Sequence, residues 1–280
     1  MYDYVFGSKK YIKKYSEEFL IFVKHLLPRY CNSIPDSMAI TIFREVRKIK
    51  DKKAVILETG TGASTLALFL ACYLNNTSFI SYEINHEKVK LIKKILNQSM
   101  CKYLKINLNK IWKPVVQSSL NKTKGIPSLK KNVIFSYVDS DHNLKHIEKE
   151  ILSIKNKIKT KGIFLFDDMN LQIQEKNFNF LETIKYKKIL KNFKIQKFKS
   201  SKTTLRDHFI PFLKKNFHKI NEMKTFYKSN YKKDLYYKNY GIDYFYNQVS
   251  QILFEKKSSL KEKNNLIKNR ALLVKVFVNK

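Results

Sequence analysis

Short apolar runs alternate with helix-patterned segments between residues 54 and 166, and this alternation limits the possible folds more than any other feature of the chain. The apolar runs are typical of buried strands and lie at 54–58, 79–83, 133–138 and 163–166, with a further strand expected within 103–118. The segments between them carry apolar residues at helical spacing and cover 64–74, 86–97 and 144–154. Strands that alternate with helices form a parallel sheet covered on both faces, so we predict an α/β fold.

The segments outside this alternation divide the chain further. Residues 1–50 have the pattern of helices, and a basic, tyrosine-rich stretch extends from about residue 200 to 268. Strand-like patterns occur at 193–198 and again at 271–278. We therefore expect four parts, which are N-terminal helices at 1–50, a cofactor-binding core at 51–200, a basic insertion or cap at 201–268 and a final strand of the core sheet within 269–280.

The formal net charge of +33 narrows the function less than its size suggests. Of the 56 basic residues only five are Arg, the residue preferred for bidentate contacts with phosphate and guanine. Abundant Lys, Asn and Ile are typical of an AT-rich genome. We therefore attribute most of the charge to composition. A small-molecule or glycan partner is favoured, and a nucleic acid is the less favoured alternative.

Nothing in the sequence indicates a membrane or an oxidising compartment. No stretch of about 18 apolar residues predicts a membrane span, and the N-terminus lacks the pattern of a signal peptide. The three cysteines, Cys31, Cys72 and Cys101, are odd in number and have no metal-binding spacing. We expect a reduced, cytoplasmic setting and leave the oligomeric state open.

The turn after the first apolar run has the composition of a cofactor loop. Residues 58–62 read Glu-Thr-Gly-Thr-Gly and lead into a helix, as in many loops that bind cofactors. A dinucleotide fold prefers Gly or Ala three residues after Gly62, whereas this chain has Thr65. The carboxylate of Glu58 would repel a pyrophosphate but suits a cofactor with a positive sulfonium and an amino group. Glu83 ends the second run, where a carboxylate can accept both ribose hydroxyls.

Residues 57–65 resemble the first motif of the class I S-adenosylmethionine (SAM)-dependent methyltransferases. Their sequence, Leu-Glu-Thr-Gly-Thr-Gly-Ala-Ser-Thr, is similar to the branch written Glu-x-Gly-x-Gly-x-Ser-Thr. The resemblance covers about residues 50–200 and implies a Rossmann-like, mostly parallel sheet of seven strands with an antiparallel last strand at 271–278. It also implies SAM as the cofactor, with contacts at Glu58, Gly60, Thr61, Gly62, Ser64, Glu83 and Asp139.

Acidic residues follow the expected strands at 133–138 and 163–166. The chain resembles the metal-dependent small-molecule and sugar O-methyltransferases, and this resemblance implies that Asp139, Asp167 and Asp168 hold a divalent ion. Carboxylate ligands suit Mg²⁺, Mn²⁺ or Ca²⁺, and clustered carboxylates repel each other unless a cation or protons intervene. The catechol-type enzymes have Asn at the position of Asp168 and Lys at the position of His142. In the alternative, Asp139 only positions SAM, and Asp167 and Asp168 cap the next helix.

Two missing motifs favour oxygen as the methyl acceptor. After the strand at 133–138 the chain has neither an Asn- or Asp-Pro-Pro-aromatic segment, which marks many amine methyltransferases, nor a Pro-Cys nucleophile. We therefore expect methyl transfer to a hydroxyl of a small molecule or sugar, with Asp139, Asp141 and His142 as candidate catalytic residues. If the three acids hold a divalent metal, that ion assists by lowering the pKa of the bound hydroxyl. The alternatives are an RNA methyltransferase that uses residues 201–268 as its platform and a non-catalytic SAM-fold binding module.

Overall fold

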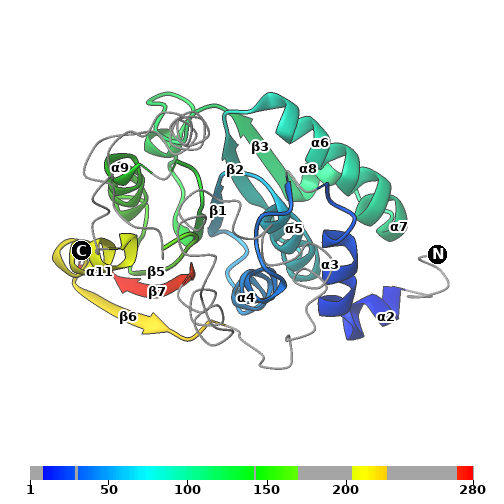
Figure 1. The fold of residues 1–280 in the computed structure, drawn as a ribbon, viewed down its shortest axis with the longest axis horizontal. Coiled ribbons are helices and arrows are strands. Elements are labelled where there is room, and N and C mark those ends of the chain that lie inside the picture. Colours follow the sequence, from blue (N-terminus) through cyan, green and yellow to red (C-terminus); the bar gives the residue numbers. More distant parts are fainter. Residues whose placement is uncertain (1–8, 29–30, 142, 170–203, 226–269, 280) are drawn as a thin grey trace, which may run out of the picture.

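The fold is known from a computed structural model that describes residues 9–28, 31–141, 143–169, 204–225 and 270–279 (Figure 1). Seven strands among these residues form one sheet in the order β3-β2-β1-β4-β5-β7-β6. The strands β1 to β5 run parallel, and β7 is antiparallel to both of its neighbours. The strands are β1 Val55–Thr59, β2 Phe79–Glu83, β3 Trp112–Val116, β4 Val133–Val138, β5 Lys161–Phe166, β6 Lys219–Met223 and β7 Leu272–Phe277.

Helices follow or precede the strands as the periodicity predicts. The longer helices are α2 Lys9–Lys14, α3 Ser16–Lys24, α4 Asp36–Arg47, α5 Ala63–Asn75, α6 His86–Leu96, α9 Leu144–Lys155 and α11 Leu205–Asn216. Short helical turns are η2 Asn97–Cys101, α7 Lys102–Leu104, α8 Leu108–Ile111 and η3 Ile126–Ser128. The predicted α/β fold with a mostly parallel seven-stranded sheet is therefore confirmed. Within the described residues, none of the helices has the length and apolarity needed to cross a membrane.

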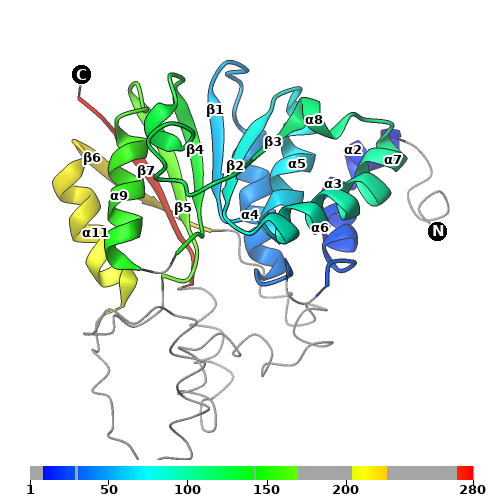
Figure 2. The ribbon, with the colours of Figure 1, turned by 90° about the horizontal axis from the view of Figure 1, so that it is seen from above.

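Alternating residues of the strands separate two hydrophobic cores. Ile56 of β1 and Leu165 of β5 belong to the core under helices α2 to α6, whereas Leu57 and Phe166 belong to the core under α9 and α11. Figure 2 shows α9 and α11 together on one side of the sheet and the N-terminal helices on the other. The strands β1, β4 and β5 are therefore largely buried on both faces, which explains why their sequences are mostly apolar.

The C-terminal part of the sheet differs from the expected division of the chain. Residues 201–268 were expected to form an insertion, but α11 and β6 belong to the core, and β6 pairs with β7 from Lys219↔Phe277 to Met223↔Leu273. The strand β6 lies at the edge of the sheet, so several of its residues stay exposed and it shows no apolar run. Residues 226–269, and the strand expected at 193–198, lie outside the described residues.

A buried ion pair joins the N-terminal helices on the α4 side of the sheet. The ammonium of Lys24 is fully buried, and its Nζ lies 2.8 Å from Oδ1 of Asp36, the first residue of α4. His25 Nε2 lies 3.0 Å from Oδ2 of the same carboxylate. The ammonium of Lys24 and the carboxylate of Asp36 are both removed from water, so the attraction between them must offset the cost of their desolvation.

Lys24→Met should lower the free energy of unfolding by about 3 kcal/mol, because the buried carboxylate of Asp36 then loses its ammonium partner. Urea denaturation followed by circular dichroism measures this loss. Lys90→Met is the matched control, because Lys90 and its partner Glu87 are both exposed on α6, and its denaturation midpoint should match that of the wild type. Equal midpoints for the two variants would contradict the role of the buried pair.

Candidate active site

The carboxyl ends of three parallel strands, β1, β4 and β5, meet at one edge of the sheet. Thr59 at the end of β1 pairs with Val138 at the end of β4, and the amide of Asp139 donates to Thr59 O at 3.0 Å. The amide of Asp167 donates in turn to Val138 O at 3.1 Å. These main-chain bonds set the residues that follow β1, β4 and β5 side by side, which is where parallel sheets of this kind bind ligands.

Gly60 allows the cofactor loop to contact the end of β4. Its φ is +80°, and a Cβ atom at this position would lie 2.0 Å from the carbonyl oxygen of Asp139. Its amide donates to Tyr82 O at 2.9 Å. Gly62 has extended backbone, and a Cβ there would lie 3.3 Å from the carbonyl oxygen of Cys31. Only Gly60 is therefore required by both space and backbone conformation.

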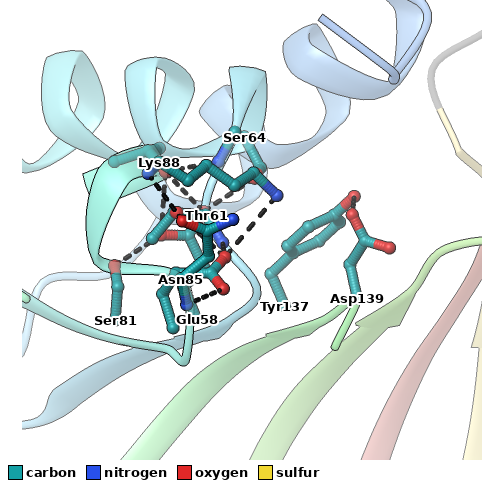
Figure 3. A network of polar contacts seen from close by, with 11 residues as sticks. Glu58, Thr61, Ser64, Ser81, Asn85, Lys88, Tyr137 and Asp139 are labelled. Carbon is teal, nitrogen blue, oxygen red and sulfur yellow. Dashed lines mark hydrogen bonds and ion pairs between the residues drawn. The ribbon is translucent and has the colours of Figure 1, made fainter. Parts of the chain in front are cut away.

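Glu58 is buried beneath the loop and accepts hydrogen bonds from three hydroxyl groups (Figure 3). Ser64 Oγ donates at 2.7 Å, Thr65 Oγ1 donates at 3.0 Å to each carboxylate oxygen, and Ser81 Oγ donates to Oε2. Two of these hydroxyls accept a further bond, from Gly62 N and from the indole of Trp112. Glu58 and Ser64 therefore hold the loop from inside, and direct contact of either side chain with SAM remains a prediction.

Burial raises the pKa of Glu58 from 4.5 to about 7, although the bonds from Ser81, Ser64 and Thr65 act in the opposite direction. The desolvation of this fully buried carboxylate outweighs three neutral donors. The protonation of this residue therefore changes near neutral pH.

Glu83 lies at the rim of the loop, where sequence reasoning expects the ribose. Its Oε2 accepts from Thr61 N at 3.0 Å and from Thr61 Oγ1 at 3.1 Å, and its Oε1 accepts from Asn85 N at 2.9 Å. Lys88 Nζ lies 3.5 Å from Oε2 (Figure 3). The structure thus brings together two residues that were assigned to the cofactor, Glu83 and Thr61.

The three acids that the resemblance assigns to a metal also come together. Ligand atoms of Asp139, Asp167 and Asp168 all lie within 4.8 Å of one another, with Asp139 half-buried and the other two buried. Asp168 has a φ of +53°, a conformation that L-residues rarely adopt. The convergence that was expected from neighbouring strand ends is therefore present.

Sequence reasoning missed the cation that this cluster already contains. The buried guanidinium of Arg270 donates to Asp167 through Nε at 2.5 Å and Nη2 at 2.8 Å, and its Nε lies 3.0 Å from Asp168 Oδ1. The hydroxyl of Tyr137 lies 3.1 Å from Asp167 Oδ2 and 3.3 Å from Asp139 Oδ2. Because both oxygens of Asp167 are occupied, the residues present do not fit an ion bound by all three acids.

Desolvation dominates the ionisation of this cluster. Burial raises the pKa of Asp167, and Asp168 adds to this effect, while Arg270 lowers it. Burial also raises the pKa of Tyr137 well above its ordinary value, with Asp139 and Asp167 adding to the effect. Tyr137 therefore stays a neutral hydroxyl that donates to the acids.

The remaining catalytic candidates lie at the start of the loop that follows β4. Asp141 is exposed, and its Oδ1 accepts from Asn143 N at 3.1 Å. His142 lies outside the described residues. Of the candidate proton acceptors in the described loop, Asp139 is therefore closest to the cofactor loop.

A second group that the sequence does not reveal is Glu150, a fully buried residue of α9. It accepts from Ser140 Oγ at 2.8 Å and from Ser119 Oγ, and it lies near Thr59 Oγ1 at 3.5 Å. His146 Nε2 lies 3.2 Å from Oε1, and this bond raises the pKa of the imidazole. Glu150 thus connects the end of β1 with the segments that follow β3 and β4.

Comparison with known proteins agrees with this geometry. Residues 57–169 match a family model described as a methyltransferase domain, and this range includes the loop, Glu83 and all three acids. Residues 57–169 of the chain are therefore similar to a methyltransferase domain. No curated protein matches the chain.

Solved structures with similar chain courses come from several methyltransferases. The O-methyltransferase of Bacillus cereus in complex with S-adenosylhomocysteine (SAH) is 12% identical, with a TM-score of 0.48 and coverage of 99% of this chain and 100% of that one. An SAH-bound methyltransferase of Podospora anserina is 17% identical, with a TM-score of 0.41 and coverage of 54% of this chain and 61% of the other. Magnesium protoporphyrin IX methyltransferase from Synechocystis, with bound SAH, is 10% identical, with a TM-score of 0.44 and coverage of 87% and 84%.

Gly60→Ala should destabilise the protein by about 2–4 kcal/mol, because the new methyl group meets a main-chain carbonyl and the positive φ is strained. The cofactor loop must then move, so SAH binding measured by calorimetry should weaken at least about tenfold. Gly62→Ala is the control for stability alone, because its backbone is extended and its nearest contact is longer. A Gly60→Ala variant that is as stable as Gly62→Ala would contradict this account of the loop.

Glu58→Gln should change how stability depends on pH. The folded-state pKa of about 7 lies above the ordinary value of 4.5, so Glu58 favours the folded state below pH 4.5 and loses this contribution as the pH rises through 7. Wild type should therefore lose up to roughly 3 kcal/mol relative to Glu58→Gln between pH 4.5 and 8. Denaturant unfolding of both proteins across this range measures the difference, and a constant difference would show that the carboxyl titrates normally.

Proposed function

We propose that the protein transfers the methyl group of SAM to a hydroxyl oxygen of a small molecule or sugar. A bond forms between the acceptor oxygen and the methyl carbon, and the bond between sulfur and methyl breaks. The positive sulfonium becomes the neutral thioether of SAH, and the acceptor proton passes to a carboxylate. The observation that carries this proposal is the half-buried Asp139, whose main chain packs against Gly60 of the cofactor loop.

Asp139 is the residue that we assign to the proton. A general base must come within hydrogen-bond reach of the proton it removes, and Asp139 is the least buried of the three converging acids. Tyr137 lies beside it and donates to the cluster, which holds the carboxylate in position (Figure 3). Asp141 is the second candidate. Alignment of the acceptor oxygen with the methyl group supplies most of the acceleration in such a reaction.

We assign the ribose hydroxyls of SAM to Glu83. Its carboxylate already accepts from an amide and a hydroxyl of Thr61, so its oxygens face the rim of the loop. Gly60 and Gly62 bring the main chain close to the cofactor without side chains in the way. No step of the reaction is assigned to a metal, because hydrogen-bond donors already occupy both oxygens of Asp167.

The absence of an amine-type motif supports oxygen as the acceptor. The residues after β4 read Asp139-Ser140-Asp141-His142, without the Pro-Pro-aromatic segment of many amine methyltransferases. Ligand atoms of the three acids lie within 4.8 Å of one another, and this convergence argues against a non-catalytic module. The three cysteines are free and buried, in accord with a reducing, cytoplasmic setting.

RNA is the second candidate acceptor, and the formal net charge of +33 is the observation that favours it. If the protein retains RNA in a way that weakens steeply with salt, and radioactive SAM labels that RNA, the acceptor is RNA and not a small molecule. Screening hydroxyl-bearing metabolites and sugars for transfer of the labelled methyl group tests the favoured proposal. SAH binding without transfer to any member of either panel would support the non-catalytic module.

Two variants separate the roles of the acids once an acceptor is known. Asp139→Asn should lower kcat at least about 100-fold, because the amide cannot take the proton, while SAH binding stays within a few-fold of wild type. Glu83→Ala should instead weaken SAH binding by about 10- to 100-fold, because a charged acceptor of hydrogen bonds is lost. Calorimetry and steady-state kinetics measure both. Unchanged kcat in Asp139→Asn would remove Asp139 as the base.

A further inference from the structure

The four acceptor positions of one carboxylate in the acidic cluster are all in use. An ionised carboxylate has about four lone-pair sites, two on each oxygen. Asp167 Oδ1 accepts from Arg270 Nε at 2.5 Å and from Asp168 N at 2.8 Å. Asp167 Oδ2 accepts from Arg270 Nη2 at 2.8 Å and from the Tyr137 hydroxyl at 3.1 Å. A divalent ion would have to displace one of these donors to reach Asp167.

The guanidinium that fills these positions is fixed by the sheet. Phe166 pairs with Leu272 in the antiparallel register of β5 and β7, and Met169 N donates to Arg270 O at 2.9 Å. The main chain therefore holds Arg270 beside the two acids that follow β5. Its side chain is only 1% exposed, so solvent does not compete for the bidentate contact.

The charge and chemistry of Arg270 match those of a resident cation. A guanidinium keeps its charge at every physiological pH, and its planar fork fits a carboxylate in two parallel hydrogen bonds. The same Nε lies 3.0 Å from Asp168 Oδ1, so one cation faces two acids from neighbouring positions. Repulsion between these acids, which otherwise calls for a metal, is offset by a residue of the chain itself.

We infer that Arg270 is a built-in counter-cation that occupies the place of a divalent ion at the ends of β4 and β5, and that this site works without a metal. Arg270 is a positioning residue, because it touches the acids and acts through them. The consequence for methyl transfer rests on the proposed function, whereas the consequence for metal binding does not.

Titration with Mn²⁺, followed by electron paramagnetic resonance and thermal unfolding, tests the inference on the whole protein with and without SAH. Wild type should bind no Mn²⁺ at millimolar concentrations, and its Tm should move by less than about 1 °C. Arg270→Met should lower the Tm by about 10 °C, because two buried acids lose their cation. Millimolar Mn²⁺ should then restore about 5 °C in this variant alone, since Asp167 can accept the ion.

Matched variants distinguish this gain from a general effect. In Arg270→Met with Asp167→Asn, the response to Mn²⁺ should disappear, because the amide is a poor ligand. Arg206→Met removes a partly exposed Arg of α11 that contacts O of Ala271, the residue after Arg270, and it should show neither the large loss of Tm nor the response to Mn²⁺. If Arg270→Met does not fold, the titration of the wild type still shows whether the site binds Mn²⁺.

Tight binding of Mn²⁺ to wild type that Asp167→Asn, or Asp168→Asn, abolishes would overturn the inference. Loss of methyl transfer in excess EDTA with rescue by Mg²⁺ would overturn it as well. Neither result affects the proposed methyl transfer. Failure of the wild type to bind SAH would reject the proposed function, while the Mn²⁺ titration would still test the role of Arg270.

Discussion

The close contact between Gly60 and the carbonyl oxygen of Asp139 is the constraint on which the rest of the site depends. It leaves no space for a side chain, so the loop after β1 lies directly against the end of β4. Apart from Glu83 of β2, the residues proposed for cofactor binding and for catalysis belong to these two segments. The distance between these two segments is therefore set by main-chain packing, which is less variable than side-chain contact.

Around this contact, buried carboxylates are matched to their donors in three different ways. Glu58 is surrounded by hydroxyl groups, Glu150 by hydroxyl groups and a histidine, and Asp167 by a guanidinium. A buried carboxylate without such partners would be strongly unfavourable. The differing partners give the groups different charge behaviour, because burial raises the pKa of Glu58 to about 7 whereas Asp167 faces a permanent cation. The buried part of the site is thus polar, and each of its three acids has hydrogen-bond donors that compensate for its burial.

Most of the parallel part of the fold was predictable because β1, β2, β4 and β5 are largely buried and mostly apolar. The strand β3 was located less narrowly because most of its residues are only half-buried. The cofactor loop was predictable because glycines and acids at fixed spacing precede a helix. The strand β6 was not, because an edge strand such as Lys219–Met223 has no continuous apolar face. Arg270 and Glu150 were missed for another reason. Asp167 lies 103 positions from Arg270, and Ser119 and Thr59 lie 31 and 91 positions from Glu150, so only tertiary structure brings these groups together.

The hydrogen bond from the Trp112 indole to Ser81 has a consequence for observing the protein. Trp112 is the single tryptophan of the chain, it is buried in β3, and Ser81 in turn donates to Glu58 under the cofactor loop. The emission of an indole depends on the polarity and hydrogen bonding around its ring nitrogen. The chain therefore contains one intrinsic fluorophore connected to the loop through one hydroxyl group, and its spectrum reports the state of that loop without any label.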